Sequence, residues 1–146
     1  MFEWQRFFVF AIFAVVIGIV DFQSQKIPNV LLFILTGILL AADILGDFRS
    51  MPLRFMACLG AYGFFYAVYR LRGGLGFGDV KYAGVIGYYL GPYEVLNGLL
   101  CAVLLALAYC LLGRLIFHWE REKRFPFGPW LGCGAIAAGL FHWSVL

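Results

Sequence analysis

The chain has 146 residues, of which 64% are hydrophobic, 19% aromatic and only 13% charged, and its formal net charge is +3. Soluble domains carry about 25% charged residues, so this composition excludes a water-soluble globule and indicates an integral membrane protein. Because the net charge is small and the basic residues lie near the ends of apolar segments, a nucleic-acid-binding surface is also excluded.

The apolar segments predict an all-α fold, a polytopic transmembrane helical bundle of about six helices that forms a single domain over residues 1–146. The expected segments are residues 4–20, 27–42, 53–69, 80–90, 95–112 and 127–143. Segment 80–90, which is followed by Gly91-Pro92, is shorter than the roughly 17 residues that the shortest spanning helices need. It is therefore expected to be sheltered by its neighbours or to start inside a water-filled cavity.

The basic residues are distributed unevenly between the two ends of these helices. Eight of the 11 fall at the end that holds the connections after the first, third and fifth segments. Because positive charge prefers the cytoplasm, both termini are expected to lie outside. Asp21 and Asp79 then emerge at the cytoplasmic face, whereas Asp43 and Asp47 are interpreted as charges of the outer face.

Cysteine and histidine residues give no pattern that is typical of a metal site. The four cysteines are scattered through apolar segments without a C-x-x-C pair, so they are interpreted as small buried apolar residues. His118 and His142 each precede a tryptophan, at positions where amphipathic rings gather at a membrane interface. No metal and no organic cofactor are expected.

Two carboxylates stand out because ionisable residues in a membrane bundle are expensive and mark functional sites. Asp21 ends the first apolar segment, and Asp79 follows a glycine-dense stretch whose small residues let a peptide approach closely. Each has a simpler interpretation, since Asp79 could cap the next helix and Asp21 could mark the end of its own. Lys81 has two interpretations, either neutralising a carboxylate or reaching the lipid headgroups.

A pair of neighbouring carboxylates is suited to peptide hydrolysis. Two like charges in a low-dielectric site do not ionise together easily, so the pair shares a proton. One aspartate then acts as general base on water while the other polarises the scissile carbonyl. Since the pair titrates as a unit, the sequence does not assign base and acid to Asp21 and Asp79 individually.

Three motifs resemble the bacterial type IV prepilin peptidases, which are intramembrane aspartic proteases of the G-x-G-D type. They are Asp21 followed after five residues by Ile27-Pro28-Asn29, the GFGDVK stretch at residues 76–81, and the FPFGP turn at residues 125–129. The resemblance implies an endopeptidase that removes the basic leader of prepilin or pseudopilin-like substrates, at the cytoplasmic face of the bacterial inner (cytoplasmic) membrane. It implies catalysis by Asp21 and Asp79, without a metal or cofactor. The residues expected to shape the site or bind substrate are Gly76, Gly78, Lys81, Pro28 and Asn29.

The chain resembles a short form of that family. Its long members carry an additional N-terminal domain with C-x-x-C cysteines that methylates the product, whereas few residues precede Asp21 and the cysteines here are unpaired. The peptidase core without the methyltransferase is therefore expected, with a protein substrate and the lipid bilayer as partners and the oligomeric state open. The alternatives are a small transporter or proton relay, and a structural subunit of a pilus or secretion assembly. A relay would be expected to carry its carboxylates near helix centres and to show an internal repeat.

Overall fold

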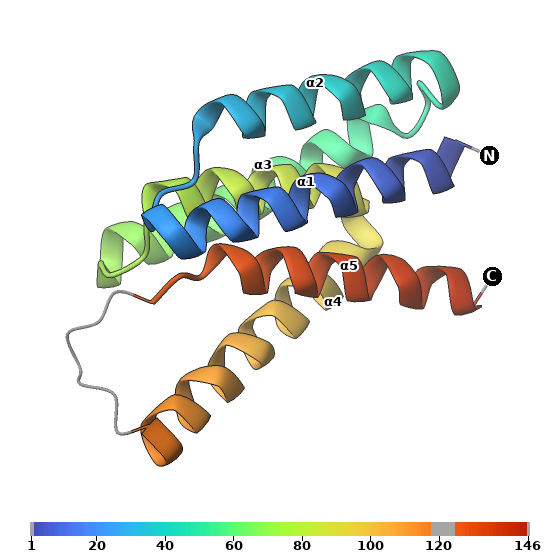
Figure 1. Cartoon of the computed structure of the whole chain (residues 1–146). Helices are drawn as coiled ribbons and strands as arrows, with labels where there is room; N and C mark the ends of the chain where they lie inside the picture. Colours follow the sequence, from blue (N-terminus) through green and yellow to red (C-terminus); the bar gives the residue numbers. More distant parts are fainter. Residues whose placement is uncertain (1, 118–124, 146) are drawn as a thin grey trace.

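The computed structural model describes residues 2–117 and 125–145, and within these residues the chain is helical without any strand (Figure 1). Four helices, α1 to α4, are long and apolar enough to cross a membrane. The predicted all-α polytopic bundle is therefore confirmed. The helices are α1 (Phe2–Ser24), α2 (Asn29–Gly46), α3 (Met51–Arg72), α4 (Phe77–Phe117) and α5 (Gly128–Val145).

Helix α4 joins two of the expected segments, 80–90 and 95–112, across a break. Gly91 is non-helical there (φ 75°, ψ −179°), and Pro92 follows it. Proline has no N–H for the helical ladder and its ring clashes with the preceding turn, so the helix does not continue straight. In Figure 1 the second half of α4 (orange) runs back at an angle to the first (yellow). The break expected at Gly91-Pro92 is thus present, and the six predicted segments are all accounted for.

The first half of α4 is the central element of the bundle. Helices α3 and α5 pack against α4, α1 packs against α5, and α2 packs against α1 and α4. Side chains from Tyr82 to Tyr89 are buried in succession, and Phe10 of α1 and Leu131 of α5 are fully buried in the same core. The short segment is therefore sheltered by its neighbours, which is one of the two arrangements expected from its length.

The outer surface of the bundle is strongly apolar. Large side chains such as Phe33 on α2, Leu59 on α3 and Leu115 on α4 are exposed, together with many others on each helix. Extended exposed apolar surface marks contact with a membrane or a partner, because water does not solvate it favourably. With four candidate spans, this surface fits a protein embedded in a lipid bilayer.

Both chain ends lie at one end of the bundle, and the α1–α2 and α3–α4 connections lie at the opposite end (Figure 1). Asp21 and Asp79 flank these two connections. They therefore share one end of the molecule, as the count of helical segments predicted.

The interpretation of Asp43 as a surface charge of the other end is wrong. Its side chain is 1% exposed and forms an ion pair with Arg6, which is 3% exposed. The Tyr88 hydroxyl donates to Asp43 Oδ2 at 2.6 Å, and Arg54 Nε lies 4.0 Å from the same oxygen. A buried carboxylate persists when it is paired and hydrogen-bonded in this way. Asp47, by contrast, is exposed as expected.

Arg54 also supports the break in α4. Its Nη1 donates to the Tyr89 carbonyl oxygen at 3.0 Å, and its Nη2 pairs with Glu3 at 3.3 Å. Carbonyl groups at the end of a helix have no helical N–H partner and need another donor. The guanidinium supplies one two residues before Gly91, which ties α3 to the end of the first half of α4.

Candidate active site

Asp21 lies in the last turn of α1, and a tight connection follows it. Gln25 adopts a left-handed conformation (φ 53°), and its N–H donates to the Asp21 carbonyl oxygen at 2.8 Å. Pro28, with φ −70° and ψ 124°, then precedes the first residue of α2. The helix end is therefore closed three residues beyond Asp21, and the Asp21 side chain, 4% exposed, points into the bundle.

The Asp21 carboxylate is held by the start of the last helix. The N–H of Gly128, the first residue of α5, donates to Asp21 Oδ2 at 3.1 Å. Helix N-termini favour negative charge because their N–H groups are unpaired and aligned. A Cβ atom at position 128 would lie 2.7 Å from Asp21 Oδ2, so this close approach requires glycine. Asp21 thus takes the place of a cap on α5 and is fixed in orientation.

The Asp79 carboxylate is held in the same manner at the start of its own helix. Helix α4 begins at Phe77, three residues earlier than expected, so Asp79 lies in the first turn and is not the N-cap. The Gly76 N–H donates to Asp79 Oδ2 at 3.2 Å, and the Asp79 N–H donates to the Gly76 carbonyl oxygen at 3.1 Å. This reciprocal pair corresponds to the back-bonding half of a capping box.

Both carboxylates open onto one cavity of about 530 Å³ at this end of the bundle. This volume lies within the range of about 300–1,000 Å³ typical of ligand sites. We call it the carboxylate cavity. Its walls come from the α1–α2 connection, the end of α3 and the start of α4, and include Asp21, Lys26, Tyr69, Leu75, Asp79 and Lys81.

The other predicted site residues divide into those that line this cavity and one that does not. Gly76, Gly78, Asn29 and Lys81 line it, whereas Pro28 is the residue that precedes α2 and only shapes the connection. Lys81 Nζ donates to Asn29 Oδ1 at 3.0 Å and lies 4.8 Å from the centre of the Phe77 ring. Lys81 therefore joins α4 to α2, which neither interpretation from the sequence anticipated.

Ile27 and Gly128 are among the residues of this region that were missing from the predicted set. Ile27 packs between Gly78 and Gly128, since a Cβ at these glycines would lie 3.1 Å from Ile27 Cβ and 3.2 Å from Ile27 Cδ1 respectively. Gly128 itself appeared only as part of a turn, because nothing local to the last helix indicates a contact with Asp21. A glycine that opens an apolar helix is the one available signal.

Among the described residues, no group of three or more histidine, cysteine or acidic side chains could hold a metal ion. His118 and the charged segment 120–124 lie outside the described residues, as does the side chain of His142. Chemically, the carboxylate cavity offers two carboxyl groups in fixed orientations, an arrangement that suits proton transfer to and from a bound water.

The fold and this cavity define a class: polytopic helical membrane proteins in which two buried carboxylates from different helices meet at one end of the bundle. Comparison with known proteins gives the particular family. The model of the type IV leader peptidase family matches residues 8–111, and the chain belongs to that family. This range contains both Asp21 and Asp79.

Curated relatives share the family and extend beyond this chain. The prepilin leader peptidase/N-methyltransferase of Bacillus subtilis (strain 168) is 25% identical over 139 residues, which cover 94% of this chain and 56% of the relative. The protein of the same name from Burkholderia pseudomallei (strain K96243) is 29% identical over 132 residues, 84% of this chain and 41% of the relative. The Escherichia coli (strain K12) protein is 25% identical over 143 residues, which cover 93% of this chain and 63% of the relative. The chain thus spans about half the length of these relatives. No solved structure matches it.

Proposed function

We propose that this chain is an aspartic endopeptidase that removes the basic leader peptide of prepilin or pseudopilin-like proteins. The observation that carries the proposal is the convergence of Asp21 and Asp79, on α1 and α4, at one cavity within a chain of the type IV leader peptidase family. We further propose that residues 1–146 act as a single transmembrane peptidase domain, with no metal or organic cofactor.

The reaction follows from the placement of the two carboxyl groups. One of them, ionised, removes a proton from a water molecule, which attacks the scissile carbonyl carbon. The other, protonated, donates a hydrogen bond to the carbonyl oxygen, and the departing nitrogen is protonated as the bond breaks. The N–H groups of Gly76 and Gly128 fix both carboxyls, so little reorganisation is needed on binding. Either aspartate can serve as the base, because a coupled pair titrates as a unit.

The cavity also suits an extended peptide. Gly74, Gly76 and Gly78 line it with little side-chain bulk, so a backbone can lie close to the carboxyl groups. A helical substrate must unwind to present its amide there.

The cleavage assay that tests this function uses the full chain in lipid vesicles with a prepilin-like substrate. The leader should be removed, and a chelator or a thiol blocker should leave the rate unchanged, because the proposed mechanism uses neither a metal nor a cysteine. Activity that is lost on chelation and restored by zinc would contradict the aspartic mechanism. Failure to process any prepilin-like protein would contradict the function itself.

We also propose that the carboxylate cavity faces the cytoplasm and that both termini face away from it. Lys26, Arg70 and Arg72 are exposed at the cavity end, as the preference of positive charge for the cytoplasm requires. An alkaline phosphatase fused to the C-terminus should be active, and a fluorescent protein that matures only in the cytoplasm should be dark. The reverse pattern would overturn this orientation.

A further inference from the structure

A groove of about 300 Å³ lies between α2 and α3, over the first half of α4. We call it the α2–α3 groove. Helix α2 packs against α1 and α4, and in Figure 1 it stands apart from the helices below it. The side chains that line the groove are almost all apolar, and among them are Leu32, Phe33, Leu40, Phe55, Cys58 and Val85.

The length of this groove corresponds to several turns of a helix. On α2 its lining runs from Asn29 to Leu40, which at 1.5 Å per residue is about 16 Å along the helix axis. The hydrocarbon core of a bilayer is about 30 Å thick. The groove therefore extends from the carboxylate cavity to about the middle of the membrane, along the outer side of the bundle.

The α2–α3 groove and the carboxylate cavity are continuous. Asn29 and Lys81 line both, and the hydrogen bond between them (3.0 Å) joins α2 to α4 where the two meet. A chain that lies in the groove would therefore enter the cavity that holds Asp21 and Asp79 by crossing beside this bond. The groove is apolar, whereas the cavity is polar and is lined by two aspartates and two lysines, so together they fit a chain that changes from a polar extended segment to an apolar helix.

We propose that the α2–α3 groove binds the apolar membrane helix of the protein substrate and positions the adjoining extended segment in the carboxylate cavity. The proposal rests on the proposed peptidase function, because the guest is the substrate of that reaction. A lipid chain would fill the apolar groove but would leave the polar cavity of about 530 Å³ unfilled. A helix that continues into an extended segment fits both spaces.

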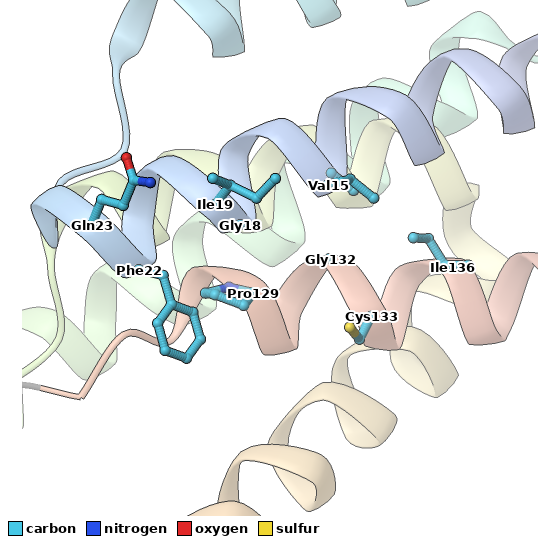
Figure 2. A pocket seen from close by; sticks show the side chains of 10 residues that line it. Val15, Gly18, Ile19, Phe22, Gln23, Pro129, Gly132, Cys133 and Ile136 are labelled. Atoms are coloured by element: carbon cyan, nitrogen blue, oxygen red, sulfur yellow. The ribbon is translucent and has the colours of Figure 1, made fainter.

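A second groove provides a direct comparison. It has a volume of about 340 Å³ and lies between α1 and α5, where Figure 2 shows Val15 and Phe22 of α1 facing Pro129 and Cys133 of α5. We call it the α1–α5 groove. In the described part of the chain, its lining shares no residue with the carboxylate cavity. It therefore lacks the continuity that makes the α2–α3 groove a route to the carboxylates.

Each groove contains a native cysteine, Cys58 in the α2–α3 groove and Cys133 in the α1–α5 groove. Two full-length variants, each keeping one of these thiols, would be made in an Asp79→Asn background so that the substrate stays uncleaved. A prepilin-like substrate with one cysteine in its apolar helix is then added in vesicles with a bismaleimide. Labelling with a simple maleimide verifies beforehand that both thiols react.

Substrate adducts should form with Cys58, with a yield that rises and falls every three to four positions as the substrate cysteine is moved along its helix. Adducts formed mainly with Cys133 would place the substrate in the α1–α5 groove and overturn the proposal. Absence of adducts with either thiol would leave lipid as the occupant and would overturn it as well. Because this readout needs no cleavage, it is independent of whether the peptidase function is correct.

A groove-filling substitution gives a second measurement. Thr36 lines the α2–α3 groove, whereas Ile34 on the same helix does not and is exposed. The preference is the kcat/KM for the full-length substrate divided by the kcat/KM for a short soluble peptide that spans the cleavage site. Thr36→Trp should lower this ratio by about tenfold or more. Ile34→Trp is the matched control and should keep that preference. If Thr36→Trp and Ile34→Trp show the same ratio, the groove proposal is contradicted. If the unmodified chain cleaves neither substrate, only the proposed peptidase function is contradicted.

Discussion

Asp21→Asn and Asp79→Asn are each expected to lower the rate of leader cleavage by about a thousandfold or more. Each removes one member of the proposed catalytic pair, which would share a single proton and perform one reaction. Groups that act as a unit are non-additive when they are removed, so the double variant should be no slower than the slower single variant. The measurement is conversion of a prepilin-like substrate to its shorter form by the full chain in vesicles.

Asparagine is a suitable replacement because its side-chain oxygen can accept the hydrogen bond that each carboxylate accepts in the structure. Gly128 N–H and Gly76 N–H each donate to one carboxylate oxygen, and the asparagine side-chain oxygen can accept the same bond. Folding and insertion should therefore persist, which a melting curve in detergent would verify. Asp47→Asn is the matched control, since Asp47 is exposed at the other end of the bundle and its loss should leave cleavage unchanged. Full cleavage by well-folded Asp79→Asn protein would refute the catalytic pair.

Asp43→Ala is expected to destabilise the protein by about 3–5 kcal/mol, which is the usual effect of removing one member of a buried ion pair. The substitution leaves the Arg6 guanidinium buried without its carboxylate and removes the acceptor of the Tyr88 hydroxyl. The measurement is the free energy of unfolding in detergent, by heat or by a denaturing detergent. Cleavage should decrease only in proportion to the fraction of folded protein.

The control for this prediction removes both charges together. Replacing a buried ion pair by apolar residues of similar size is often neutral, so Arg6→Met combined with Asp43→Leu should recover much of the lost stability. Arg54 keeps its contact with Glu3 in that variant, at 3.3 Å in the present structure. A double variant as unstable as the sum of its single variants would show that the two side chains do not interact, contrary to the structure.

Local signals in the sequence were sufficient for most of the fold. The apolar runs predicted the helical segments, and Gly91-Pro92 predicted the break in α4, because both depend on residues close together in the chain. The number of segments then placed Asp21 and Asp79 at the same end. The start of α4 was missed by three residues, since its first turn is formed by the glycine-rich stretch itself.

The remaining features depend on contacts between distant helices. Asp43 has the appearance of an ordinary charge near a helix end, and only the approach of Arg6, 37 residues earlier, makes it a buried ion-pair partner. The hydrogen bond between Gly128 and Asp21 joins residues 107 positions apart. No periodicity or spacing encodes such pairs, because they arise from the way that helices pack.

The contact between Asp21 and Gly128 also has a consequence for biosynthesis. Ribosomes add about 5 to 20 residues per second, so a separation of 107 residues corresponds to a delay of roughly 5 to 20 s between the two residues. Once residue 79 has been added, the emerging chain contains both aspartates, but the Gly128 N–H that holds Asp21 has not yet been made. The site is completed only when the last helix enters the bundle. A nascent chain therefore carries both aspartates of the proposed site without its geometry until α5 has been made.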